Sequence, residues 1–178
     1  MMQKEGLALY YPRRTLILTA LTAMLSGILL HFLFSHWPNS VTALFSPVNE
    51  SLWEHVKLLF WPYLLSALWL NRDRPGGLRP WAFTLLLLCA LLLLLGYLYH
   101  VPLGGRSLWV DIVLYLILMA LGFWLPTRFS GPFHSLPWLL APCLVLLLGG
   151  FILFFTFFPP DQILFTQLAA GYWLTLPC

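Results

Sequence analysis

Residues 81–99 read WAFTLLLLCALLLLLGYLY and contain no charged side chain. A helix rises about 1.5 Å per residue, so about 20 apolar residues of this kind cross the hydrocarbon core of a bilayer. The run is continuous and lacks the alternation of apolar and polar side chains that is typical of a membrane β-barrel strand. The segment therefore predicts a transmembrane α-helix.

Four further apolar runs of similar length lie on either side of this segment, and proline or polar turns separate them. They cover residues 15–36, 52–70, 108–125 and 138–158. Residues 161–178 are moderately apolar but interrupted by polar residues, which favours a segment that lies in the membrane interface. The prediction is an all-α fold: a polytopic helical bundle of about five transmembrane helices plus an interfacial C-terminal segment, with residues 1–178 forming one domain.

The overall composition agrees with this fold, since 61% of the residues are hydrophobic and only 8% are charged. A soluble domain carries about 25% charged residues. The formal net charge is +3, but the basic residues are dispersed and form no dense run of the kind that binds nucleic acid. The composition therefore predicts the lipid bilayer as the partner and excludes nucleic acid.

The basic residues also predict the orientation, because Lys and Arg are retained on the cytoplasmic side of a membrane. With five spans and the N-terminus inside, the outer loops carry only Arg106, and the cytoplasmic segments carry Lys4, Arg13, Arg14, Arg72, Arg74, Arg79 and Arg128. We expect a multi-pass protein of the plasma (inner) membrane with a cytoplasmic N-terminus and an extracytoplasmic C-terminus.

Most of the other ionisable residues fall at the outer end of the predicted spans. They are His31, His36, Glu50, Glu54, His55, Lys57, His100, Asp111 and Asp161. Such groups are costly in or near hydrocarbon, and they usually face the bundle interior, pair with one another or line a water-filled cavity. Their shared depth predicts a single polar site to which several helices contribute.

Residues 49–57, which read NESLWEHVK, hold the densest part of this set. At about 100° per residue, Glu50, Glu54 and Lys57 share one stripe of a helix. Two carboxylates beside a histidine suit general acid–base chemistry. The catalytic candidates are therefore Glu50, Glu54 and His55.

Histidine and carboxylate side chains at the same level are candidate ligands for a divalent metal such as Zn²⁺. These candidates are His31, His55, His100 and Asp111. The local spacing matches no standard metal motif, since the chain has neither H-E-x-x-H nor Glu-x-x-His there. Structural alternatives stay open: the glutamates pair with Lys57 near a helix N-terminus, and Asp111 compensates a helix dipole.

Residues 45–58 read FSPVNESLWEHVKL, in which Ser46–Pro47 has the pattern of a helix N-cap followed by proline at the first helical position. The segment resembles the hallmark F-S-P-V-N-E-S-x-W-E-H-x-K-L of a family of small bacterial polytopic membrane proteins catalogued only as a domain of unknown function. His31 ahead of the motif and Asp111 in a later span are further points of similarity. The resemblance implies an all-helical, membrane-embedded fold and brings no established activity.

Three functions are compatible with such a site. The sharpest hypothesis is a metal-assisted hydrolase that acts on a lipid or lipid-linked substrate. An ion or proton-coupled transporter would use the same groups to bind a cation or relay protons. A non-catalytic partner of another membrane protein would use the motif as a structural ion-pair element. The sequence identifies no substrate, metal or protein partner.

Overall fold

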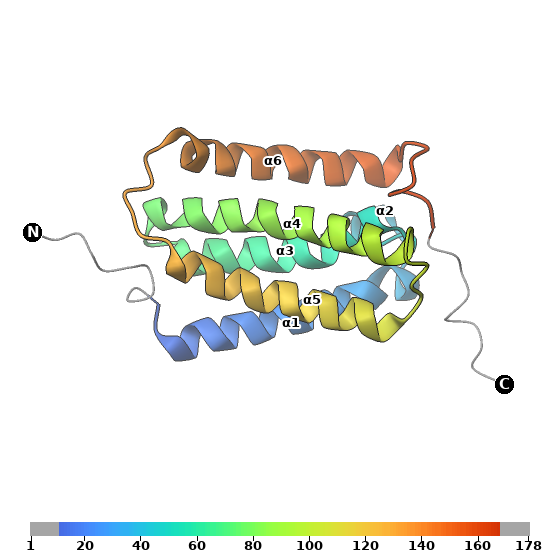
Figure 1. Cartoon of the computed structure of the whole chain (residues 1–178), viewed down its shortest axis with the longest axis horizontal. Helices are drawn as coiled ribbons and strands as arrows, with labels where there is room; N and C mark the ends of the chain where they lie inside the picture. Colours follow the sequence, from blue (N-terminus) through green and yellow to red (C-terminus); the bar gives the residue numbers. More distant parts are fainter. Residues whose placement is uncertain (1–10, 168–178) are drawn as a thin grey trace, which may run out of the picture.

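The computed structural model describes residues 11–167, and all regular structure in this range is helical. Its elements are α1 (Arg13–His36), α2 (Ser40–Phe45), α3 (Leu52–Asn71), the 3-10 helix η2 (Pro75–Gly77), α4 (Leu78–His100), α5 (Leu108–Trp124), the 3-10 helix η3 (Leu125–Arg128) and α6 (Leu136–Phe157). The five long helices run side by side along the longest axis of the molecule, and the short α2 lies at one end of the bundle (Figure 1).

Each predicted apolar run corresponds to one long helix, so the all-α prediction is confirmed for residues 11–167. Three predicted boundaries coincide with the structure: α1 ends at His36, α3 begins at Leu52 and α5 begins at Leu108. The short helix α2 was not predicted, because its 6 residues are too few to show a helical period in hydropathy.

The helices α1, α4, α6 and the segment Leu108–Arg128 are long and apolar enough to cross a membrane. The helix α3 is not among them, since its first turns carry Glu54, His55 and Lys57. It contacts each of the other four long helices and therefore forms the centre of the bundle. The outer helices expose many large apolar side chains, which fits a membrane protein. The fifth crossing stays a prediction.

Helix α2 is fixed to α3 through its last backbone carbonyls, which have no partner within the helix itself. The Nζ of Lys57 donates to the carbonyl of Ala43 at 2.9 Å, and the indole N–H of Trp61 donates to the carbonyl of Leu44 at 3.0 Å. Two side chains one turn apart on α3 thus donate hydrogen bonds to backbone carbonyls at the C-terminal end of α2.

The prediction that Ser46 caps the N-terminus of α3 is wrong. Ser51 is the N-cap, and its Oγ accepts the N–H of Glu54 at 3.3 Å. Ser46 instead ends α2 and is buried against α1, where its hydroxyl donates to the carbonyl of Leu30 at 2.6 Å and accepts the N–H of Phe34 at 2.9 Å. The hydroxyl therefore bridges a donor and an acceptor that would otherwise bond within α1.

Three aromatic rings join α3, α4 and α5 in the core. Tyr63, Trp81 and Phe123 are buried, and their ring centroids lie 5.5 to 5.6 Å apart. The hydroxyl of Tyr63 donates to the carbonyl of Gly122 at 2.8 Å. A methyl group at Gly122 would lie 2.7 Å from the ring of Tyr63, so the glycine allows this close packing.

Helix α1 lies close to α3 where Gly27 faces the carbonyl of Leu58. That carbonyl has no helical partner, because Pro62 lacks the N–H that would bond to it. A Cβ at Gly27 would lie 2.6 Å from the Leu58 oxygen and would also meet the hydroxyl of Tyr115 from α5. This hydroxyl donates to the carbonyl of Met24 at 3.1 Å. Three helices therefore meet at Gly27.

The predicted interfacial segment spans residues 161–178, of which 168–178 lie outside the described residues. Residues 161–167 form turns that cover the start of α3. The backbone N–H of Trp53 donates to the carbonyl of Leu164 at 3.0 Å, and the rings of Trp53 and Phe165 lie 4.9 Å apart. The described part of this segment thus packs on the bundle.

The substitution Gly27→Ala is predicted to destabilise the fold by about 1–3 kcal/mol, because the added methyl group must displace a backbone carbonyl. The measurement is the unfolding midpoint in detergent micelles. Gly150→Ala is the matched control: it also lies in a long helix, a Cβ there meets nothing within 4 Å, and alanine is the better helix former by about 0.5–1 kcal/mol. Equal midpoints for the two variants would contradict the close approach of α1 and α3.

Candidate functional site

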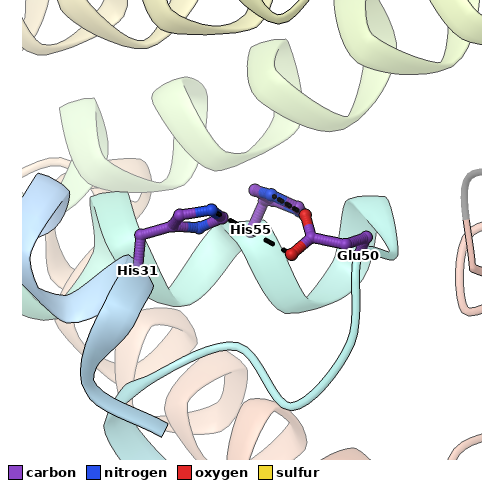
Figure 2. Close-up of side chains that lie close together, drawn as sticks. All are labelled: His31, Glu50 and His55. Carbon is purple, nitrogen blue, oxygen red and sulfur yellow. Dashed lines mark ion pairs between the residues drawn. The ribbon is translucent and has the colours of Figure 1, made fainter. Parts of the chain in front are cut away.

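Three of the predicted site residues meet at the end of the bundle where α3 begins. His31 comes from the last turns of α1, Glu50 from the loop before α3, and His55 from the first turn of α3. Figure 2 shows the carboxylate of Glu50 directed toward both rings. Its two oxygens lie 4.0 Å from Nε2 of His31 and 3.3 Å from Nε2 of His55.

The close approach at Gly27 is what brings the two histidines together. His31 lies one turn beyond Gly27 on α1, and His55 lies one turn before Leu58 on α3, which runs in the opposite direction. The ring centroids of the two histidines are 5.5 Å apart. The packing of small residues in the middle of the bundle therefore determines the geometry of the site at its end.

The ring of His55 is held from both sides. Its Nδ1 lies 2.7 Å from the carbonyl oxygen of Ser51, and its Nε2 faces Glu50. Nε2–H donates to the Glu50 carboxylate, and the contact at Nδ1 orients the ring. A metal ion bound at Nε2 would replace this proton, and the ring would then donate its single N–H from Nδ1 to the Ser51 carbonyl. A metal-binding histidine is usually oriented by such a backbone contact.

Glu50 does not lie on the helical stripe that the spacing predicted. The helix begins at Leu52, and Glu50 stands in a bend ahead of it, so its carboxylate points to the histidines and not along α3 toward Glu54. The hydrogen bond from His55 is the main cause that lowers the pKa of the Glu50 carboxyl, although burial opposes this shift. Glu50 is therefore an anion at neutral pH and stabilises the fold less as the solution becomes acidic.

The donor set of His31, Glu50 and His55 fits a divalent metal ion. One ligand atom from each residue lies within 4.8 Å of the other two. Ligands that bind Zn²⁺ tetrahedrally at about 2.0 Å are about 3.3 Å apart, so the Glu50–His55 spacing already suits the metal and His31 needs a small movement inward. Two histidines and one glutamate with an open fourth position are typical of catalytic zinc sites.

Glu54 lies outside this set and forms a buried ion pair with Lys57. Its Oε2 accepts hydrogen bonds from Nζ of Lys57 at 2.7 Å and from the N–H of Val48 at 2.8 Å. Nζ of Lys57 has two further acceptors, the carbonyls of Ala43 and Ser46 at 2.9 and 3.4 Å. The pair is nearly or fully inaccessible to solvent, at 4% and 0%. The geometry favours the structural alternative for Glu54.

His100 and Asp111 form a second polar pair, which joins the end of α4 to the start of α5. Nε2 of His100 lies 2.9 Å from Oδ1 of Asp111, and Nδ1 lies 2.9 Å from the carbonyl oxygen of Gly105. Neither residue belongs to the ligand cluster of His31, Glu50 and His55. The predicted site is therefore divided into a three-residue cluster and a neighbouring pair.

No pattern in the sequence predicts the backbone groups that orient these side chains. The carbonyls of Ser51 and Gly105 each fix one histidine ring. Every residue type has a carbonyl, so such contacts leave no trace in the order of residues. Ser46, which ties α1 to the loop carrying Glu50, was misassigned for a related reason: Ser-Pro is typical of helix starts in general.

In the part of the chain that the structure describes, the fold is all-helical, with four apolar helices of membrane-spanning length and a partly buried polar site at one end. The chain belongs to a family of unknown function (DUF6512), which matches residues 8–174. This bears out the expected membership in an uncharacterised family. No curated protein and no solved structure matches the chain.

The variants Glu54→Gln and Lys57→Met are each predicted to destabilise the fold by about 3–5 kcal/mol, because each leaves the other buried charge without its partner. The double variant is expected to be more stable than the sum of the two losses implies. Unfolding in detergent, evaluated as a double-mutant cycle, measures this coupling.

The exposed pair of Arg72 and Asp73 provides the control for the buried pair. Its side chains are 61% and 83% accessible, so Asp73→Asn should cost no more than about 1 kcal/mol. Two outcomes would contradict a large coupling energy in the buried pair. One is additive losses of stability in the Glu54–Lys57 cycle, and the other is a loss of stability in Asp73→Asn as large as in Glu54→Gln.

Proposed function

We propose that the protein is a membrane-embedded, metal-dependent hydrolase whose divalent ion, such as Zn²⁺, is held by His31, Glu50 and His55. The single observation that carries the proposal is the convergence of these three ligand atoms to within 4.8 Å. A divalent ion polarises the bond that is cleaved and lowers the pKa of water, which is the chemistry a hydrolase needs.

The accessibility of the cluster supports binding of a metal and a substrate. The side chains of His31, His55 and Glu50 are 19%, 26% and 36% accessible, so the cluster is sheltered but open to small molecules. It lies at the end of helices whose outer surfaces are apolar. A substrate with a lipid tail could keep its tail along these surfaces while its polar head reaches the cluster. We therefore propose a lipid or lipid-linked ester as the substrate class.

We further propose that this end of the bundle faces the extracytoplasmic side of the plasma (inner) membrane. The opposite end carries most of the cations, namely Arg13, Arg14, Arg72, Arg74, Arg79 and Arg128, whereas the site end carries Arg106 and the buried Lys57. This asymmetry supports a cytoplasmic N-terminus.

The protein purified in detergent with added Zn²⁺ is expected to retain one metal ion per chain, measured by elemental analysis. His31→Ala, His55→Ala and Glu50→Gln should each lower zinc affinity by at least about 100-fold, since loss of a supporting contact alone costs about 10–100-fold. His36→Ala is the control, because His36 is exposed at the same end of α1 and lies outside the cluster.

Three results would contradict this function. Wild-type protein that binds no divalent metal, although its unfolding transition is intact, would exclude the metal site. Protein in liposomes that mediates cation-dependent flux and hydrolyses no ester would favour the transporter alternative. Loss of fold stability or of a co-purifying protein in Glu50→Gln, with no change in bound metal, would favour the non-catalytic partner.

Cysteine labelling tests the orientation. In a variant with Cys89, Cys143 and Cys178 replaced by serine, Arg106→Cys should react with a membrane-impermeant maleimide in spheroplasts. Arg72→Cys should react only after the membrane is permeabilised. Both positions are exposed, so accessibility to the reagent depends on the side of the membrane. The reverse pattern would contradict the orientation.

A further inference from the structure

The pair of His100 and Asp111 is held in place by a turn that leaves it little freedom. Gly104 has a φ of 60°, which glycine adopts without strain, and the N–H of Gly105 donates to the carbonyl of Tyr99 at 2.8 Å. A Cβ at Gly105 would meet the ring of Tyr99. The turn thereby aims the Gly105 carbonyl at Nδ1 of His100.

The ring of His100 is fixed by its contacts. Both ring nitrogens of His100 lie close to oxygen atoms, a carbonyl oxygen at 2.9 Å and the Asp111 carboxyl group at 2.9 Å. These two contacts hold the ring in one orientation, with Nε2 directed at Oδ1 of Asp111.

The carboxyl group of Asp111 is accessible to a second partner. The contact to His100 uses Oδ1, and the Asp111 side chain is 39% accessible, whereas the side chain of His100 is only 10% accessible. The His100 ring is thus the more buried member of the pair, and the carboxyl group of Asp111 is the member that water reaches.

Helix packing turns Asp111 toward the cluster of His31, Glu50 and His55. Tyr115 on α5 faces Gly27 on α1. Asp111 lies one turn before Tyr115 on α5, and His31 lies one turn beyond Gly27 on α1. Asp111 and His31 therefore extend from the same contact toward the same end of the bundle. The charge of Asp111 also acts on His55.

We propose that Asp111, positioned by His100, is the general base for water that attacks a substrate bound at the His31, Glu50 and His55 cluster. In this step the water oxygen forms a bond to the phosphorus or carbonyl carbon of the ester, and the water proton moves to Asp111. The ester oxygen leaves with the electrons of the broken bond and takes that proton from Asp111. Asp111 is a catalytic residue, and His100 is a positioning residue. The inference rests on the proposed function.

The test uses full-length protein with bound Zn²⁺ and two probes, 4-nitrophenyl butyrate and bis(4-nitrophenyl) phosphate. Asp111→Asn is expected to lower kcat on the hydrolysed probe by about 10²–10⁴-fold, with zinc content and KM unchanged. Asp111→Glu should recover part of the rate. His100→Gln should lower kcat less and alter its pH profile, because the carboxyl group of Asp111 loses the ring that positions it.

A second readout does not depend on turnover. In protein labelled with ¹⁵N-histidine, the His100 signal is the one that His100→Gln removes. Asp111→Asn should shift this signal, because Nε2 of the ring loses its carboxyl partner. Tyr115→Phe, one turn further along α5, is the control and should leave this signal unchanged.

The outcomes separate the two proposals. Wild-type protein without zinc contradicts the proposed function. Zinc-loaded wild-type protein that cleaves neither probe also contradicts the proposed function. Hydrolysis by the wild type together with full kcat in Asp111→Asn overturns the role of Asp111. Loss of zinc in Asp111→Asn also overturns it, because Asp111 would then act as a ligand. A His100 signal that Asp111→Asn leaves unchanged overturns the positioning role.

Discussion

The buried pair of Glu54 and Lys57 is the interaction on which the site end of the molecule depends. The ammonium group has an acceptor for each of its three N–H bonds, one carboxylate and two carbonyls. Those carbonyls belong to α2 and to the residue that ends it, so one charged side chain on α3 fixes the whole segment between α1 and α3. The hydrogen bonds of the ammonium group and of Oε2 of Glu54 offset the desolvation of the two charges.

That segment in turn holds Glu50 in front of the two histidines. Ser46 secures it against α1, and Ser51 caps α3 while its carbonyl orients His55. The residues of the motif therefore divide into two groups: Glu54 and Lys57 build the support, and Glu50 and His55 face the site. Adjacent positions in the sequence serve different purposes because the helix begins between Glu50 and Glu54.

The polar cluster and the apolar exterior both follow from the position of α3 among the other long helices. A membrane protein keeps charged groups away from lipid by pairing them or enclosing them, and α3 does this by lying in the centre of the bundle. The four outer helices are apolar enough to contact lipid, so the polar residues of α3, the Glu50 loop and the ends of α1, α4 and α5 meet where the helices end. The metal-dependent hydrolase with a lipid substrate that we propose would use both features.

The sequence by itself determined the helices. Long apolar runs between prolines and polar turns have one stable form in a membrane. The last residue of α1 and the first residues of α3 and α5 were therefore predicted to the residue. The sequence also identified the residues of the candidate site, since ionisable groups beside apolar runs are costly in a membrane. The sequence could not show which of these residues form the cluster and which form the separate pairs. Whether Glu54 faces Lys57 or the histidines depends on where α3 starts, and the separation of His100 and Asp111 from His31 depends on how α1, α3 and α5 meet at Gly27. These are contacts between segments distant in the chain, and only the tertiary structure decided them.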